Sequence, residues 1–594
     1  MIVDTEKIEL VLTGFAPFWP EHPERALFLS PCCFTHRDES MIQLLEKYRT
    51  APTPWQNKAQ YKEAGLYVSD LIDRLIPGMT DVLNQWYETD FSNHFWRIAT
   101  ITWLNAFVSA CYDFWERIRL IQELPENPDI RIRVLKDPVP YKILDYPHFS
   151  QVITTHEYNI HLFSQMMRRA EFSGIQCAEE DVRVKISEPE RKIKHTGSLR
   201  ERVSFRAAGW IHRAGRFCYS RWLHSDIHFG SVKGLPRRDR IRLRMLRRRK
   251  PIPEMDARPI LPKAEPAEFL VREMGFSPKT DFESMMPEML LKNIPRRLLT
   301  GIPALEGCEQ VRFWVGNDVL HSQTEAFKIA RVVESGGTWI SVQHGAGYGQ
   351  SLLQTLEKIE IETSENFISW GWNQSDNFKG RVLPMSSPYL SRIRKKERRG
   401  SKIILVGTMR PLYCHRFDSN LTTEDAGSYL KHKLSFISGL SDIMKERLYY
   451  KPYFDDYGTH EKEMVASILG TDHILDAKQR VTKYISFDNL LIVDHPGTVL
   501  LEAAAVNMPF IFFFSPEIFP PSSTMAVYLH SLRKAGVYHE TPEAAAGHCE
   551  KIGMDIRSWW YSHDVHAAVE SFRQKYARAS AAYFDEWAEF VREQ

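Results

Sequence analysis

One histidine stands at the start of a glycine-rich loop. His344 follows the apolar segment 339–342, which predicts a buried strand, and glycines occupy positions 345, 347 and 349. Glycines let backbone N–H groups approach a ligand, and ligands of open α/β sheets bind beyond the carboxyl ends of strands. An imidazole there can exchange a proton near neutral pH. The loop therefore predicts a catalytic His344 with Gly345 beside the ligand; the alternative is a tight turn that carries a surface histidine.

Two glutamates follow this loop. We predict that segment 359–363 is a short extended run, so that Glu360 and Glu362 share one face of a strand. Carboxylates on that face could orient the imidazole of His344 or bind the hydroxyls of an acceptor, and we assign both as catalytic candidates. A surface stripe of solvated acids is an equal alternative.

A second strand, turn and helix begin near residue 490. The apolar run 490–493 leads into DHPGT at 494–498, and a helical pattern follows. Helix N-termini attract anions through unpaired N–H groups and the helix dipole. We therefore predict that Gly497 and Thr498 bind a phosphate and that Glu502, one helical turn further on, binds the hydroxyls of a sugar or ribose. An ordinary turn with a buried glutamate is the alternative.

Two further segments carry groups suited to a nucleotide donor. Gly407 and Thr408 follow the apolar run 403–406 and form a weaker phosphate loop. In the block 449–458, YYKPYFDDYG, Lys451 could meet a donor phosphate and the aromatic rings could stack on a base. We include Asp456 of this block in the donor site, although a solvated turn explains the acids equally well. No DxD pattern or histidine cluster accompanies them, so we predict no metal and no cofactor beyond a nucleotide-sugar co-substrate.

The composition is that of a soluble globular protein. The 594 residues include 43% hydrophobic and 26% charged residues, which indicates two or three domains. Segment 98–115 is the longest weakly charged run, but its polar residues favour a buried helix over a membrane span. The opening residues lack the pattern of a secretion signal, and the eight cysteines include no CxxC pair. We therefore expect a cytoplasmic protein.

Positive charge is concentrated in one segment. Residues 181–251 contain 21 Lys and Arg against 6 Asp and Glu, and Trp210, Phe217 and Trp222 lie among them. A solvated face is one interpretation. Docking on an anionic membrane surface is another, because Lys and Arg mixed with aromatic residues are typical of membrane interfaces. No nucleic-acid recognition motif accompanies the charges, so we expect no nucleic-acid partner. A peripheral position at the inner membrane follows from the second interpretation.

Strands and helices alternate in the second half of the chain, which predicts parallel sheets with covering helices. Strands are predicted at 8–12, 26–29, 312–315, 338–342, 403–406, 490–494 and 510–514. Helical patterns cover 40–122, 322–334 and, as one long amphipathic helix, 565–593, whereas 128–140 is predicted as a loop or edge strand. We place an acceptor-side domain at 1–375 with a basic insertion at about 181–266, a nucleotide-donor domain at 376–564 and a C-terminal amphipathic helix at 565–594.

The order of several motifs resembles a bacterial transferase family first noted in leptospires and encoded in surface-polysaccharide loci. The loop QHGAGYG (343–349) is followed by IEIETSENFISWGW (359–372). Further segments with the same likeness are PFWPEHPERALFL (17–29), FWRIATITWL (95–104), YFDDYG (453–458), TVLLEAAAVNMPFIFF (498–513), HETPEAAAGH (539–548) and WWYS (559–562). The likeness covers nearly the whole chain.

This resemblance implies an α/β protein of the GT-B glycosyltransferase type. Two Rossmann-like domains would face a cleft, with helical and basic insertions in the N-terminal half. The HG loop and the later glutamate-bearing turn also look like the teichoic-acid polymerases that use CDP-glycerol, whose HG histidine is the proposed base; that role falls on His344. The family's opening strand usually ends in paired glutamates before a tryptophan. This chain has APFW at 16–19 instead, with Glu21 and Glu24 as the substitutes at hand.

The expected function is therefore transfer of a sugar from a nucleotide-sugar donor to a surface-glycan or lipid-linked acceptor, in capsule or O-antigen assembly. A polyol-phosphate transferase or a nucleotide-sugar epimerase on the same fold is an alternative. A non-catalytic membrane-surface scaffold is a third, which the missing opening glutamates and the basic segment favour.

Overall fold

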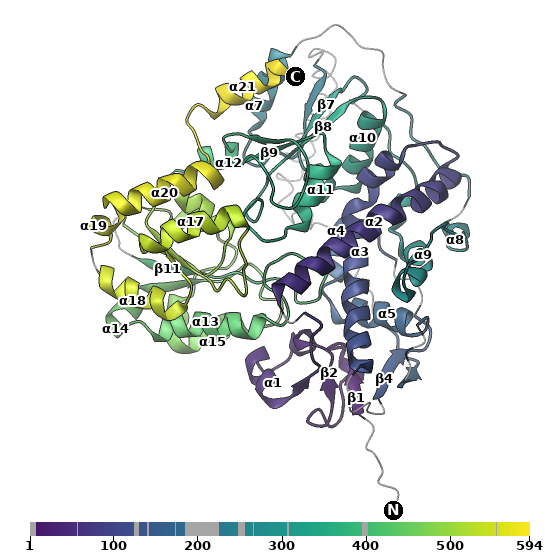
Figure 1. Ribbon diagram of the computed structural model, residues 1–594, viewed down its shortest axis with the longest axis horizontal. Helices are drawn as coiled ribbons and strands as arrows, with labels where there is room; N and C mark the ends of the chain where they lie inside the picture. The colour runs from purple at the N-terminus through teal and green to yellow at the C-terminus, as the bar shows by residue number, and fades with distance from the viewer. Residues whose placement is uncertain are drawn as a thin grey trace, which may run out of the picture.

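Three parallel five-stranded sheets build the protein in the computed structural model (Figure 1). Every strand pair is parallel. The structure describes residues 8–55, 57–123, 130–138, 142–170, 172, 174–184, 225–247, 256–264, 266–305, 308–394, 402–486, 488–553 and 555–594.

The three sheets follow one another along the chain, and each is named here by its place in the sequence. The N-terminal sheet, in the order β3-β2-β1-β4-β5, has β1 Ile8–Val11, β2 Leu27–Phe28, β3 Arg49–Thr50, β4 Ile130–Leu135 and β5 Ile175–Glu180. The middle sheet, β10-β9-β8-β7-β6, has β6 Ile227–Phe229, β7 Phe313–Val315, β8 Thr338–Val342, β9 Asn366–Ser369 and β10 Val382–Pro384. The C-terminal sheet, β12-β11-β13-β14-β15, has β11 Ile403–Val406, β12 Leu448–Lys451, β13 Leu490–Val493, β14 Phe510–Phe513 and β15 Tyr538–His539.

Helices connect and cover the strands. In the N-terminal and middle parts they are α1 Met41–Lys47, α2 Lys58–Tyr87, α3 Asn93–Gln122, α4 Tyr146–Val152, α5 His156–Met167, α7 Arg237–Leu246, α8 Pro266–Phe269, α9 Asp281–Asn293, α10 Gln323–Glu334, α11 Thr355–Thr363 and α12 Pro388–Ser391. The C-terminal part has α13 Ala426–Ser438, α14 Asp442–Lys445, α15 Glu461–Leu469, α16 Thr498–Ala505, α17 Ser523–Lys534, α18 Pro542–Ile552, α19 Ile556–Trp560, α20 His563–Tyr576 and α21 Tyr583–Glu593.

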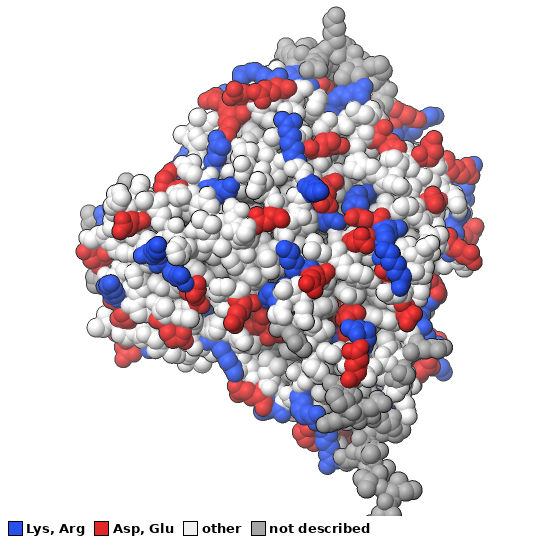
Figure 2. Space-filling view, in the orientation of Figure 1, with Lys and Arg blue, Asp and Glu red and all other residues white. Residues whose placement is uncertain are grey.

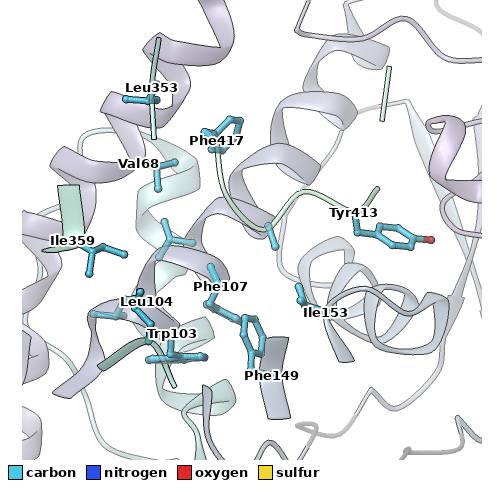
Figure 3. Close-up of a cluster of buried hydrophobic side chains, with 14 of the residues drawn as sticks. Val68, Trp103, Leu104, Phe107, Phe149, Ile153, Leu353, Ile359, Tyr413 and Phe417 are labelled. Carbon is cyan, nitrogen blue, oxygen red and sulfur yellow. The ribbon is translucent and has the colours of Figure 1, made fainter. Parts of the chain in front are cut away.

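The long helices α2 and α3 lie between the sheets (Figure 1). Their start positions are capped: the Asn57 side chain accepts hydrogen bonds from the first turn of α2, and Ser92 does so for α3. Figure 3 shows Val68 of α2 and Phe107 of α3 in a buried cluster that also contains Phe417, from the loop after β11. The two helices are thus the common core element on which the sheets pack.

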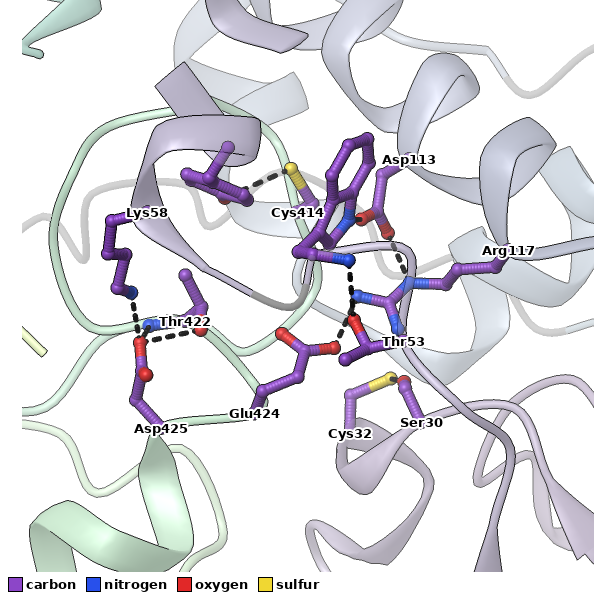
Figure 4. Close-up of polar contacts among 12 residues, drawn as sticks. Ser30, Cys32, Thr53, Lys58, Asp113, Arg117, Cys414, Thr422, Glu424 and Asp425 are labelled. Carbon is purple, nitrogen blue, oxygen red and sulfur yellow. Dashed lines mark hydrogen bonds and ion pairs between the residues drawn. The ribbon is translucent and has the colours of Figure 1, made fainter. Parts of the chain in front are cut away.

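Buried ion pairs join these helices to the C-terminal part. Arg117 of α3 donates to Asp113 at 2.9 Å and pairs with Glu424 at 2.6 Å, and Lys58 of α2 pairs with Asp425 (Figure 4). Arg117 is 4% exposed, so its loss would leave the carboxylates of Asp113 and Glu424 without their cation, which is strongly destabilising. The loop after β11 is therefore held firmly against α2 and α3.

The C-terminal segment is two helices, where we predicted one. Helix α20 packs against α16 and α17. The helical conformation is interrupted at residues 577–582, and α21 then packs against α7 on the middle sheet. Trp587 of α21 is fully buried beside Phe229 of β6. The chain therefore returns from the C-terminal sheet to close the face of the middle sheet.

The α/β fold with two Rossmann-like units is confirmed, and the N-terminal sheet is added to it. Two local predictions were wrong. Segment 128–140 contains β4, which lies between β1 and β5 and is no edge strand. Segment 359–363 is the end of helix α11 and not a strand: Glu360 lies buried with the isoleucines, so only Lys358 and Glu362 mark the polar face of the helix. The domain boundaries at 375 and 564 stay predictions.

The basic segment is described only in part. Trp210, Phe217, Trp222 and the pair Arg248 and Arg249 lie outside the described residues. Within the described part, Arg247 is buried and bonds both oxygens of Asp226. On the face shown in Figure 2, acidic and basic residues are interspersed. In the described ranges no helix is long and apolar enough to cross a membrane.

Candidate active site

The carboxyl edges of the middle and C-terminal sheets meet at the loop 343–349. The backbone N–H of Ala346 donates to the Thr498 hydroxyl at 3.1 Å, and the backbone N–H of Ser522 donates to the Gln350 carbonyl at 2.7 Å. Ligands of open α/β sheets bind at such edges. The first predicted motif, after β8, and the second, after β13, therefore lie against each other although 150 residues separate them in the chain.

The side chain of Gln343 fixes the backbone of the loop 343–349. Its buried side-chain oxygen accepts from the backbone of Trp370 at 2.8 Å and from the indole of Trp372 at 2.9 Å, while its nitrogen donates to the Gly345 carbonyl. Gly349 has φ 66°, and a Cβ there would lie 2.8 Å from the Trp372 ring. Only glycine combines a positive φ with so close an approach to the Trp372 ring. This packing and the hydrogen bonds of Gln343 hold the loop around His344 in one conformation.

His344 begins a hydrogen-bonded relay. Its Nδ1 lies 3.1 Å from the Tyr348 hydroxyl, which donates to Glu360. The second carboxyl oxygen of Glu360 accepts from the Ser341 hydroxyl at 2.8 Å. When Glu360 is ionised, the Tyr348 proton points to Glu360, and Nδ1 of His344 then carries the proton of its own bond to Tyr348. The remaining nitrogen, Nε2, is then the unprotonated one.

Burial sets the proton affinities along this relay. Burial is the largest of the causes that lower the pKa of His344 to about 3, and His321, at a ring distance of 6.0 Å, and the cations Lys233 and Arg416 contribute to the same shift. Burial raises the pKa of the Glu360 carboxyl to about 8. A proton that enters at His344 is therefore held more tightly at Glu360.

Glu362 points elsewhere. Residues two apart in an α-helix lie about 200° apart, so α11 places Glu362 on the face opposite Glu360. Its carboxylate pairs with Lys358 at 3.4 Å and is partly exposed. The structure therefore brings Glu360 to His344 and leaves Glu362 out.

Glu502 faces the junction from the C-terminal sheet. It is 7% exposed and accepts a hydrogen bond from the Tyr389 hydroxyl. Burial raises its pKa, and the nearby cations Lys233 and Arg480 oppose that shift. The ammonium of Lys233 lies 4.4 Å from the centroid of the Tyr389 ring. Lys233 therefore influences both His344 and Glu502.

The predicted phosphate loops lie at the ends of neighbouring strands. Gly497 is the N-cap of α16, and Thr498, its first residue, contacts the Gly345 loop. The backbone N–H of Thr408 donates to the Tyr429 hydroxyl at 2.9 Å. A Cβ at Gly407 would lie 2.5 Å from the Tyr450 hydroxyl, so close packing onto buried groups is sufficient reason for glycine there.

Lys451 and Asp456 are used by their own part of the chain. The buried Lys451 ammonium donates to the carbonyls of Pro452 and Ala477 at 2.8 and 2.9 Å. The Asp456 carboxylate accepts from the backbone of Gly458 at 2.8 Å. The structure does not bring either side chain to His344.

The paired glutamates that the family carries in its opening segment, and that this chain lacks, would lie beside the N-terminal sheet and not beside the sheet of His344. The segment 16–19 follows β1 of the N-terminal sheet, whereas His344 belongs to the middle sheet. Glu21 and Glu24 are exposed there, and Glu24 pairs with His22 at 3.3 Å. Among the described residues, no group of three or more His, Cys, Asp or Glu is arranged to hold a metal ion.

Sequence reasoning missed several groups around His344. Tyr348 stands four residues after His344, a spacing that could have suggested a contact. Lys233 lies in the basic segment, where nothing in the sequence distinguishes it from the many other Lys and Arg residues. Arg416 lies in the loop after β11 and belongs to no motif. Only the sheet arrangement places these two cations near the relay.

The chain belongs to the LIC12162 family of transferases, whose model matches residues 8–591. No curated protein matches the sequence. Among solved structures it is similar to a mutant O-GlcNAc transferase of Thermobaculum terrenum, with 14% identity and a TM-score of 0.27 over 48% of this chain and 54% of that chain. It is also similar to MurG of Acinetobacter baumannii, with 10% identity and a TM-score of 0.28 over 48% of this chain and 74% of that chain. The match spans about half the length of the first of these structures.

Proposed function

We propose that this transferase moves a sugar from a nucleotide-sugar donor to a hydroxyl of a surface-glycan acceptor. The observation that supports it most is the relay from His344 through Tyr348 to Glu360, which opens beside the N-terminus of α16. The edge of the middle sheet offers a route for a proton, and the edge of the C-terminal sheet offers N–H groups suited to a phosphate.

In this mechanism the acceptor hydroxyl gives its proton to Nε2 of His344 as its oxygen bonds the sugar carbon. The bond from that carbon to the donor phosphate breaks, and its electron pair leaves with the nucleotide. The Nδ1 proton of His344 passes to Tyr348 and the Tyr348 proton to Glu360, whose raised pKa makes it the final proton acceptor. His344 ends uncharged, so no imidazolium has to form beside the site's cations.

The donor would lie across the carboxyl edge of the C-terminal sheet. Thr498 and the N–H groups of the first turn of α16 would face its phosphate, and the buried carboxylate of Glu502 would accept hydrogen bonds from its hydroxyls. Charge that develops on the leaving phosphate would be stabilised by these fixed dipoles. The remaining candidates, Gly345, Gly407 and Gly497, would allow the backbone to approach the donor.

A cytoplasmic enzyme that acts on a lipid-linked acceptor would dock on an anionic membrane surface, and we assign that contact to 181–251. In the described part, Met245 and Leu246 are 42% and 39% exposed on the arginine-rich helix α7, a pairing suited to an interface. Pelleting with phosphatidylglycerol vesicles that fails at high salt supports the contact. Equal pelleting with neutral vesicles contradicts it.

Nucleotide binding tests the proposed function most directly. Thermal-shift measurements with CMP, CDP, UDP and GDP should show stabilisation by one base, about 2.7 kcal/mol at a hundredfold excess over Kd. Incubation of that donor class with glycan acceptors should then release free nucleotide. Turnover of CDP-glycerol, or interconversion of the sugar without transfer, would favour a polyol-phosphate transferase or an epimerase. A protein that binds no nucleotide is no donor-dependent transferase.

A further inference from the structure

Lys233 lies at the junction of the two sheets in an unusual setting. It follows β6 of the middle sheet, and its ammonium lies 4.4 Å from the centroid of the Tyr389 ring and 5.8 Å from that of Trp370. The faces of aromatic rings attract a cation and partly replace its water. The side chain is thus held in place by two rings.

No acid completes this setting. Among the described residues, no carboxylate lies within 4.0 Å of the Lys233 ammonium, and it makes no hydrogen bond. Among other inward-facing lysines, Lys58 and Lys433 pair with Asp425 and Glu461, and Lys451 donates to two backbone carbonyls. A partly buried cation without an anion is unfavourable, because burial removes water that no partner replaces.

Glu502, the acid whose charge acts on Lys233, is already bound by another group. Glu502 accepts from the hydroxyl of Tyr389, the same residue whose ring faces Lys233. The tyrosine therefore holds the carboxylate and the ammonium apart on the two sheets. A ligand that inserts between the sheets meets a fixed cation on one side and a fixed hydrogen-bond acceptor on the other.

We propose that Lys233 binds the phosphate of the nucleotide-sugar donor, from the sheet opposite the one that carries Thr498 and Glu502. This inference rests on the proposed function and adds to it a division of the donor site between two sheets. A phosphate is the favoured anion because the N-terminus of α16, on the far side, is also suited to a phosphate, while Glu502 would accept hydrogen bonds from hydroxyls of the attached sugar.

The division has a consequence for His344. Lys233 is one of the cations that hold the pKa of His344 low, and a bound phosphate would compensate its charge. The imidazole would then accept a proton more readily when the donor is in place. Donor binding and proton removal from the acceptor would be coupled through one lysine.

Calorimetry with three probes tests the assignment: inorganic pyrophosphate, the nucleotide that stabilises the protein, and N-acetylneuraminate as a carboxylated sugar without phosphate. Lys233→Met keeps most of the aliphatic stem and removes the charge, and Lys263→Met, at an exposed lysine paired with Glu88, is the matched control. We expect at least a tenfold weaker affinity for pyrophosphate and nucleotide in Lys233→Met only, with partial recovery in Lys233→Arg.

Unchanged affinity for both phosphate probes in Lys233→Met overturns the inference while leaving the proposed function intact. A loss confined to N-acetylneuraminate also overturns it, in favour of a sugar carboxylate as the anion. If the unsubstituted protein binds no nucleotide, the proposed function fails first.

A second measurement needs no variant and so does not depend on folding. The unsubstituted protein is acetylated with and without pyrophosphate, and the modified lysines are identified by mass spectrometry. Pyrophosphate should protect Lys233 and leave Lys263 as reactive as before. Equal acetylation of Lys233 in both samples contradicts the inference.

Discussion

The loop after β8 and the block 449–458, which begins within β12, look alike in sequence, since each places polar and aromatic residues at the end of a strand. In the structure they differ. His344 is partly exposed beside the contact with the C-terminal sheet, and its relay ends at a buried acid. Lys451 and Asp456 instead bond backbone groups of the C-terminal part of the chain. A polar side chain can serve a ligand only where the fold leaves its functional end available. Residue type alone does not report that.

The largest expected effect is at His344. His344→Ala should lower turnover by about 10²–10⁴-fold, because the acceptor proton loses its first acceptor, while nucleotide affinity changes little. Initial rates and calorimetry measure the two quantities. His22→Ala, at an exposed histidine beyond the N-terminal sheet, is the control. If His344→Ala turns over nearly as fast as the unsubstituted protein, the loop after β8 has no more part in catalysis than the block 449–458.

Glu360 gives the relay a pH signature. Its pKa is raised to about 8, and the ionised form is the one that can receive the proton, so activity should rise as pH increases through about 8. Glu360→Gln should lose this rise and about 10²-fold of the turnover. Glu362→Gln, two residues away on the opposite helix face, should keep both. A rise that persists in Glu360→Gln assigns the proton to another group.

Glu502 tests the C-terminal side of the junction. Glu502→Gln keeps an acceptor for Tyr389 but removes the charge, so nucleotide affinity should fall by about 1.5–3 kcal/mol, or roughly 10- to 100-fold. Calorimetry against the stabilising nucleotide measures it. Normal affinity together with a lower melting temperature would make Glu502 a structural residue, like Lys451.

The smallest effect on function is expected at Lys451. Lys451→Met should leave nucleotide affinity unchanged and lower the free energy of unfolding by about 1–3 kcal/mol, because two backbone carbonyls lose their donor. Denaturant titration and calorimetry separate these outcomes. Weaker nucleotide binding in a folded Lys451→Met variant would show that the block 449–458 takes part in the donor site.

Much of the sheet framework is readable from the sequence. The strands at 338–342, 403–406, 490–494 and 510–514 are short apolar runs bounded by glycine, proline or charge, which is the pattern of buried parallel strands. Helix α11 was mistaken for a strand because Glu360 is buried although it is an acidic residue, while Glu362 is exposed on the opposite face. Ile359, Glu360 and Ile361 are all below 5% exposed, so the alternation of isoleucine and glutamate reports hydrogen bonding of the acid and not a solvated strand face.

The site is less readable than the framework. His344, Thr498 and Glu502 could be singled out because each belongs to a local strand–turn pattern. Lys233 could not, since its role depends on which sheet edges meet, and that is fixed by long-range packing of α2 and α3. The third sheet was also missed: strands at 8–12 and 26–29 were predicted, but β3 has only two residues and β4 was assigned to a loop or edge strand.

Helix α21 also constrains the order of events during synthesis. Its Trp587 completes the apolar layer over β6 and β8, yet it is translated about 200 residues after the last strand of that sheet. Until Tyr583–Glu593 leaves the ribosome, part of one face of the middle sheet stays uncovered. Nascent chains should therefore depend on chaperones for the time taken to translate the whole C-terminal sheet, and truncation before Tyr583 should convert a soluble product into an aggregating one.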